Sequence, residues 1–235
     1  LVTAIVLSFS SCMQQPKEKE ITETTSQQAY EYMTTARLTV SESKRLIAKG
    51  ISANKEVKDR LENGIVIITL GTTNTYLAEE LAGLSTPRGS FVTGRIFPSS
   101  KEDFAKGMKR LSEIVLMKGK PVDISYADAL SRMNAKDIVF KGANMVNYAK
   151  RQAAVCVGAP DGGTVAKLRK YTDRGKGRWI VPVGLEKETT QDLFEMQKLT
   201  NGDTPRGKGT VRLNVTQGNI YTEIEALKEF ADVDV

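Results

Sequence analysis

The sequence predicts an α/β protein of three layers, in which a mainly parallel sheet carries helices on both faces. Two observations predict this fold class. Over residues 60–200, short apolar runs alternate with segments in which apolar residues recur at helical spacing. No linker interrupts this alternation. Because strands and helices that alternate in this way build parallel sheets, we expect residues 36–235 to form a single α/β domain.

The clearest unit is a strand, a turn and a helix over residues 64–84. Residues 65–68 are wholly apolar, as expected of a strand that is buried on both faces. A polar turn at 71–74 follows, and then Leu77, Leu81 and Leu84 at helical spacing. Free N–H groups at the start of this helix would attract an anion, helped by the helix dipole. An ordinary capped helix explains the same residues, because Thr and Asn are common caps.

Further helices are expected wherever apolar side chains share one helical face. The first starts at Thr39 or Ser41 and runs on to Ile51, and others cover residues 55–61, 101–116, 127–133, 165–171, 189–199 and 222–230. The pattern at 101–116 is the most regular, since Phe104, Met108, Leu111 and Val115 are spaced by three or four residues. Further strands are predicted at 137–140, 153–157, 179–183 and 211–215.

Composition excludes several kinds of site. The chain of 235 residues carries a net charge of +6, which suits an anionic ligand. Its Lys and Arg residues are dispersed, so we expect no nucleic-acid partner. There is no histidine, which excludes Ser-His-Asp and Cys-His catalysis and every His-ligated metal. Two cysteines cannot form a cysteine-only zinc site, and Cys156 lies in an apolar strand as a packing residue would. Acid–base chemistry must therefore come from Asp, Glu, Lys or Tyr, and the cofactor is unknown.

The N-terminal region predicts a lipid anchor. Residues 1–9 form an apolar run too short to span a bilayer, and Ser10, Ser11 and Cys12 follow. Residues 1–12 thus resemble the end of a bacterial lipoprotein signal, although the usual basic start is missing and Phe9 is unusual. Cys12 would then be lipidated at the cell envelope, and polar residues 13–35 would form a tether. The alternative is a misassigned start on a cytoplasmic protein. The last four residues read like a new strand, so we also expect a truncated C-terminus.

Four predicted strands end in polar or glycine-rich turns, at residues 71–74, 141–144, 161–164 and 184–187. In an open α/β sheet, ligands bind outside the carboxyl ends of the strands. Parallel strands place these ends on one edge of the sheet. We therefore expect Lys141, Lys167, Asp161 and Glu186 to converge in one cleft.

The residue types at these turns suit a phosphate or a carboxylate ligand. Glu186 and Asp161 are candidate bases, and Lys141 is a candidate electrostatic stabiliser. The groups expected to hold the ligand are Gly71, Thr72, Thr73, Asn74, Gly162, Gly163, Thr164, Lys167 and Lys187. Each has an alternative: Lys141 and Glu186 could lie on the surface, and Asp161 with the glycines after it could serve only to form a turn.

The order of these turns resembles ribose-5-phosphate isomerase A, and more broadly the superfamily of sugar-phosphate isomerases, glucosamine-6-phosphate deaminase and CoA-transferases. Residues 70–75 (LGTTNT) stand where the isomerase has its Gly-Thr-Gly-Ser-Thr phosphate loop. Residues 141–145 (KGANM) stand in place of Asp-Gly-Ala-Asp-Glu. A glycine-rich turn at 161–164 (DGGT) and a strand that ends near a lysine, over residues 180–187, follow in the same order. The resemblance covers residues 40–190 and implies the fold of that superfamily.

The resemblance does not extend to the reaction that the isomerase catalyses. Lys141 and Asn144 replace the two acidic positions of the isomerase, and residues 164–167 (TVAK) keep a lysine without its glutamate. The nucleophilic glutamate motif of CoA-transferases is not recognisable. Fold and activity separate readily, so two hypotheses remain. One is an isomerase- or transferase-like enzyme that binds a small anionic metabolite, and the other is a non-catalytic, membrane-anchored lipoprotein that binds or senses a ligand. The oligomeric state stays open, a homo-oligomer among the alternatives.

Overall fold

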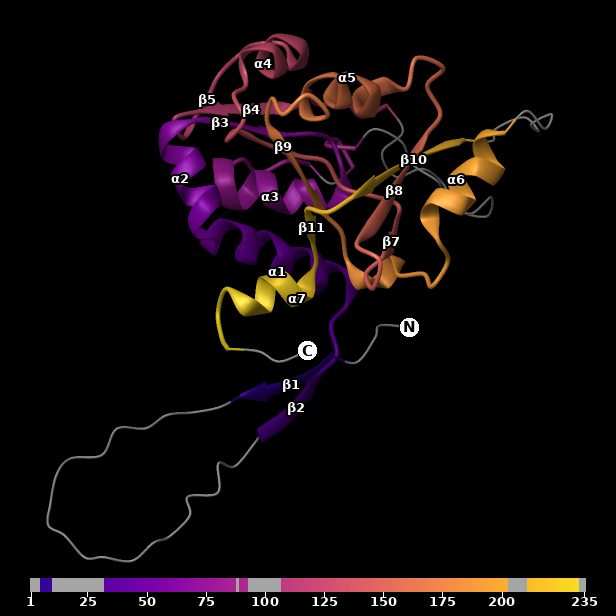
Figure 1. The fold of residues 1–235 in the computed structure, drawn as a ribbon. Helices are drawn as coiled ribbons and strands as arrows, with labels where there is room; N and C mark the ends of the chain where they lie inside the picture. Colours follow the sequence, from indigo (N-terminus) through magenta and orange to yellow (C-terminus); the bar gives the residue numbers. More distant parts are fainter. Residues whose placement is uncertain (1–4, 10–31, 88, 93–106, 203–210, 233–235) are drawn as a thin grey trace, which may run out of the picture.

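The computed structural model describes residues 5–9, 32–87, 89–92, 107–202 and 211–232 of the chain (Figure 1). Its centre is a six-stranded sheet with the strand order β11-β9-β6-β3-β4-β5. The strands are β3 (Ile65–Ile68), β4 (Ile114–Met117), β5 (Lys120–Pro121), β6 (Ile138–Phe140), β9 (Arg178–Pro182) and β11 (Ile220–Tyr221). β11, β9, β6 and β3 run parallel, whereas β4 and β5 are antiparallel to their neighbours. The predicted α/β class with a mainly parallel sheet is therefore confirmed.

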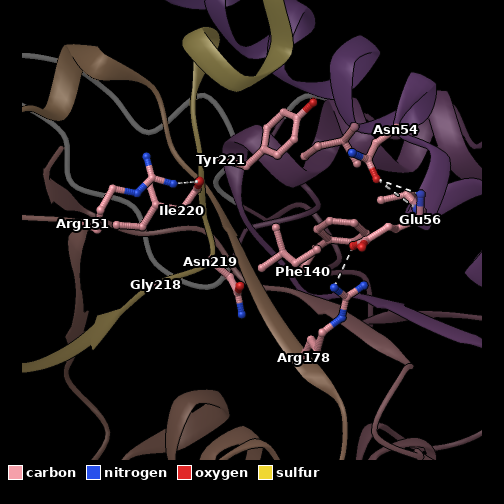
Figure 2. A pocket seen from close by; sticks show the side chains of 12 residues that line it. Asn54, Glu56, Phe140, Arg151, Arg178, Gly218, Asn219, Ile220 and Tyr221 are labelled. Carbon is pink, nitrogen blue, oxygen red and sulfur yellow. Dashed lines mark hydrogen bonds and ion pairs between the residues drawn. The ribbon is translucent and has the colours of Figure 1, made fainter. Parts of the chain in front are cut away.

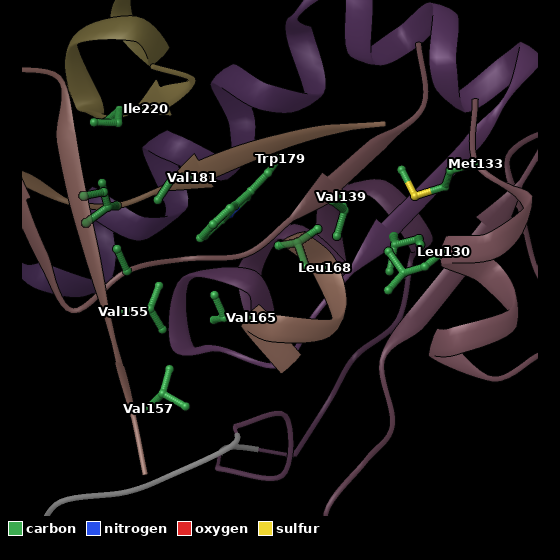
Figure 3. Close-up of a cluster of buried hydrophobic side chains, with 14 of the residues drawn as sticks. Leu130, Met133, Val139, Val155, Val157, Val165, Leu168, Trp179, Val181 and Ile220 are labelled. Atoms are coloured by element: carbon green, nitrogen blue, oxygen red, sulfur yellow. The ribbon is translucent and has the colours of Figure 1, made fainter. Parts of the chain in front are cut away.

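Helices cover both faces of this sheet (Figure 1). They are α1 (Val40–Ala53), α2 (Lys55–Asn63), α3 (Thr72–Ala82), α4 (Tyr126–Arg132) and α5 (Gly163–Thr172). Leu77 of α3 and Phe140 of β6 belong to the apolar core on one face, which α1 and α2 also cover. Leu168 of α5 and Trp179 of β9 belong to the core on the other face, beside α4 (Figure 3). Neighbouring strand residues point to opposite faces, so the sheet lies between two helical layers.

A second, smaller sheet lies beside the first. It contains β7 (Met145–Asn147), β8 (Gln152–Val157) and β10 (Arg212–Gln217), all antiparallel in the order β10-β8-β7. α6 (Leu193–Asn201) packs on it through Leu193. The prediction that residues 153–157 join the parallel sheet is therefore wrong. The chain turns tightly between β7 and β8, where Arg151 N donates to Tyr148 O at 3.0 Å, and a hairpin of this kind forces antiparallel pairing.

The helix predicted at residues 101–116 is also corrected. Residues 101–106 lie outside the described part, residues 107–113 form no helix, and residues 114–117 form β4, which pairs antiparallel with β3. Val115 and Leu116 are fully or nearly fully buried, whereas Met108 and Leu111 are each 37% exposed. The apolar run at 114–117 is thus a central strand, and its helical spacing with the residues before it is a coincidence of a short pattern.

Side-chain caps explain where two helices begin. Thr39 accepts from Glu42 N, and the Glu42 carboxylate accepts from Thr39 N at 2.7 Å, so α1 starts with a complete capping box at Thr39, the first of the two caps considered from the sequence. Thr222 and Glu225 form the same motif at the start of α7 (Glu223–Lys228). α7 directly follows β11, so its first residue lies at the end of a parallel strand.

At the N-terminus, β1 (Ile5–Phe9) pairs antiparallel with β2 (Tyr32–Ala36). Cys12 and most of the expected tether fall on residues 10–31, which lie outside the described part. The lipidation of Cys12 therefore stays a prediction. Within the described residues, no helix is long and apolar enough to cross a membrane.

Candidate functional site

The four parallel strands end on the same side of the sheet, and we call the segments that follow them the carboxyl edge. The edge consists of residues 71–74 after β3, 141–144 after β6, 184–187 after β9 and 222–223 after β11. Three of these segments were predicted from the sequence. The fourth predicted turn, at 161–164, follows β8 of the smaller sheet instead.

The first turn of α3 presents unused N–H groups. Gly71 is its N-cap and provides no side-chain cap, and the first helical bond runs from Thr75 N to Gly71 O at 2.9 Å. The main-chain amides of Thr72, Thr73 and Asn74 have no partner among the residues that the structure describes. Thr72 is exposed whereas the next two residues are buried. The alternative of an ordinary side-chain cap does not hold for this helix.

Asn74 has a structural task at this edge. Its side chain is fully buried, and Nδ2 donates to Thr69 O at 2.7 Å and to Phe140 O at 3.0 Å. The amide nitrogen thus joins the start of α3 to the ends of β3 and β6. Its Oδ1 is buried without a hydrogen-bond partner in the described part of the chain.

Lys141 is buried and forms no salt bridge with any residue that the structure describes. Only 8% of the residue is exposed, and its main chain is fixed on both sides by bonds to Ile180 O and from Trp179 Nε1. Its ammonium group makes no hydrogen bond or salt bridge to any described residue. Burial lowers the pKa of Lys141, and the nearby charges of Glu113 and Arg110 act in opposite directions. The surface alternative for Lys141 is therefore excluded.

Lys187 is held differently. It belongs to the short 3₁₀ helix η1 (Leu185–Lys187), and its Nζ donates to Ala143 O at 2.9 Å. This bond ties the segment after β9 to the segment after β6. Burial is the main cause that lowers the pKa of Lys187. Lys44 lowers it further, whereas the carboxylates of Glu186 and Glu223 oppose the shift. The carboxyl edge thus holds two lysines, of which one is bonded and one is free.

Two carboxyl groups meet at the end of β9. Glu223 is 3% exposed and accepts from the Ser43 hydroxyl and from Leu185 N, which lies 3.0 Å from Oε2. Both oxygens of Glu186 are buried and have no partner among described residues. A Cβ atom at Gly184 would overlap Glu186 Oε2 and would lie 3.0 Å from Glu223 Oε1. The two carboxyl groups therefore flank the same point above Gly184.

The residues after β8 are placed differently from the rest. Asp161 is exposed, and its Oδ1 accepts from Gly163 N at 2.9 Å, as in a turn former. Gly162 caps α5 with a positive φ of 78°, Thr164 lies in the first turn of that helix, and Lys167 is exposed. No hydrogen bond or ion pair within the described residues links this group to Lys141 or Glu186.

Other possible centres are weaker. The described residues contain no cluster of three or more His, Cys, Asp or Glu side chains that could hold a metal ion. Cys156 is half-buried, and burial raises the pKa of its thiol, which is the opposite of what a nucleophile needs. Its amide donates to Asn144 Oδ1 at 2.9 Å, so this strand position is structural.

A pocket of about 260 Å³ is lined by residues of β6, β9 and β11 and of α1 and α2 (Figure 2). Its lining includes Arg178 and Asn219, at or just before the first residues of β9 and β11, and Arg151. Arg178 is paired with Glu56 at 2.7 Å, and Arg151 with Glu225 at 2.8 Å. The pocket lining contains none of the predicted site residues. Among the described residues, the buried and unbridged Lys141 thus lies at the carboxyl edge, whereas both arginines of the pocket are paired.

Comparison with known proteins adds no family. No family model matches the sequence, and no curated protein or solved structure is significantly similar to it. The resemblance to the sugar-phosphate isomerase superfamily therefore stays a prediction.

Proposed function

We propose that this protein binds a small anionic metabolite, phosphorylated or carboxylate, at the carboxyl edge, and that it acts on this ligand as an isomerase- or transferase-like enzyme. One observation carries the proposal. The buried amino group of Lys141 forms no salt bridge or hydrogen bond within the described structure, and it belongs to the same edge as the uncapped start of α3.

A buried ammonium group without a salt bridge is unfavourable, because it has lost its hydration and gained no charged hydrogen-bond partner. Free N–H groups at a helix N-terminus also favour a negative charge nearby. Asn74 of α3 donates to Phe140 O, and Lys141 is the next residue. The helix N-terminus and the lysine, which both favour an anion, are therefore neighbours. A single anionic group of a ligand would satisfy both, since phosphate and carboxylate oxygens accept from amides and from ammonium groups alike.

The other groups of the edge suggest a division of roles. Lys187 is already bonded to Ala143 O, so it orients the loop rather than the ligand. Glu186 is the first candidate for proton transfer, because the chain has no histidine and a carboxylate can act as a general base. The structure describes Asp161 as a turn former on an exposed segment, which makes it the weaker candidate.

Thermal denaturation of the full chain with inorganic phosphate, a pentose phosphate and a short-chain carboxylate tests the proposal. At least one of these probes should raise the midpoint in proportion to the logarithm of its concentration. Lys141→Met should abolish the shift, whereas Lys167→Met, which removes the same charge from an exposed helix position, should preserve it. Equal loss in both variants, or no shift in the wild type, would overturn the proposal. Binding without turnover would favour the non-catalytic alternative.

A further inference from the structure

We infer that Glu186 and Glu223 share one proton, as a carboxylic acid–carboxylate pair that serves as the acid–base group of the carboxyl edge. The inference deepens the proposed function by naming the partner of Glu186. It concerns the protein without any ligand, so it can be tested separately from anion binding.

The geometry brings the two carboxyl groups close together. Glu186 Oε2 and Glu223 Oε1 both crowd the position that a Cβ of Gly184 would take, and only glycine leaves room for them. Because both oxygens lie close to this one position, they also lie close to each other. Among described residues, neither carboxylate forms a salt bridge.

The two groups differ in what they already receive. Glu223 accepts two kinds of hydrogen bond, from the Ser43 hydroxyl and from the Leu185 amide. Glu186 accepts none from the described residues, although both of its oxygens are buried. Two neighbouring carboxylates in a dry site cannot both stay ionised at low cost. A proton between Glu186 Oε2 and Glu223 Oε1 removes one charge and supplies the hydrogen bond that Glu186 lacks.

The surrounding charges act on this proton in known directions. Burial is the largest influence and raises the pKa of Glu223, and the charge of Glu186 adds to the rise, whereas the bonds from Ser43 and Leu185 lower it. Lys187 of η1 is the nearby cation, and its charge favours the ionised state of both carboxyl groups, whereas Lys44 of α1 acts on Lys187. Lys187 directs its Nζ to Ala143 O instead of to the pair.

Infrared difference spectroscopy of the ligand-free full chain tests the shared proton. The carbonyl stretch of a protonated carboxylic acid should persist at pH values where exposed glutamates are ionised. It should vanish in Glu186→Gln and in Glu223→Gln, and it should remain in Glu188→Gln, which alters an exposed neighbour in the same loop. A wild type without this signal would overturn the inference, whether or not the variants fold.

A second variant separates a shared proton from a merely structural contact. Ser43→Ala removes one donor from Glu223 while it leaves both carboxyl groups in place. Loss of a donor to the ionised form favours the protonated form, so the infrared signal should titrate at a higher pH than in the wild type. An unchanged titration would contradict the shared proton. Failure of every anion to bind would contradict the proposed function and would leave this result intact.

Discussion

Asn74 Nδ2 lies 3.0 Å from Phe140 O and 2.7 Å from Thr69 O, and it donates to both main-chain oxygens. One buried amide thus fixes the first turn of α3 against the ends of two parallel strands. The residue after Phe140 is Lys141, which forms no salt bridge with any described residue. The spatial relationship between the helix N-terminus and this lysine therefore depends on Asn74.

Replacement of Asn74 should destabilise the fold. Asn74→Ala removes the donor and leaves a cavity, for which we expect a loss of about 1–3 kcal/mol in the free energy of unfolding. Asn74→Asp should cost more, because it brings a carboxylate against two carbonyl oxygens. Urea denaturation measures both. Thr72→Ala, at an exposed position of the same turn, should change the free energy by less than about 0.5 kcal/mol. Equal effects at both positions would refute the role of Asn74.

Even the substitution of alanine for Gly184 should destabilise the protein. Its φ of −78° suits any residue, so the expected cost comes from displacement of the Glu186 carboxyl group by the new Cβ. We expect Gly184→Ala to destabilise the protein by about 1–3 kcal/mol. In a Glu186→Ala background this cost should shrink, which a double-mutant cycle detects. Gly158→Ala is the matched control, because its Cβ would meet its nearest neighbour, Val211 Cγ1, at 3.9 Å.

Gly71 should behave in the opposite way. Its backbone is extended, with φ 170° and ψ 154°, and a Cβ there would meet only the side chain of Asn74, at 3.8 Å or beyond. We expect Gly71→Val to leave the unfolding midpoint of the free protein nearly unchanged. Its branched side chain should obstruct the free amides of α3 and abolish the thermal shift that the best anionic probe produces. A preserved shift would remove the start of α3 from the binding site.

The stability of the fold should depend on pH through Glu223. Burial raises the pKa of this residue, so its protonated form stabilises the folded protein. That contribution is complete below the ordinary glutamate value of about 4.3 and is lost as the pH rises through the raised value. Relative to Glu223→Gln, the wild type should therefore become less stable with rising pH, as measured by urea denaturation at several pH values. A difference that stays constant with pH would contradict the prediction.

Local sequence patterns predict most helices and parallel strands of this fold. The run at 65–68, the polar turn after it and a cap at Thr39, one of the two positions expected, are found, since each depends on neighbouring residues. β4 was missed because an apolar run of four residues fits a helix or a strand equally well. The pairing of β8 depends on a partner far along the chain, Leu213 opposite Cys156, which no periodicity reveals.

The candidate site was predicted only in part for the same reason. Lys141, Lys187 and Glu186 follow apolar strands, and the rule that ligands bind at strand ends selects them. Glu223 follows β11, a strand of only two residues. The capping box around Glu223 is typical of any helix start, so the sequence does not mark this residue as part of a site. Its contact with Ser43 spans 180 residues of sequence. The one available signal was the Thr222 cap directly after Ile220 and Tyr221.

Glu186→Gln tests whether the edge performs chemistry. Glutamine has nearly the shape of glutamate but cannot take up or release a proton, and its amide can still donate to Glu223 Oε1. Fold and ligand binding should therefore persist in this variant. Turnover of a substrate found among phosphorylated and CoA-linked metabolites should fall by about two to four orders of magnitude. Glu188→Gln, at an exposed position of the same loop, should keep full activity. Turnover that survives Glu186→Gln would remove this residue from the mechanism. A loss of binding as well as turnover would assign Glu186 a role in ligand binding rather than in proton transfer.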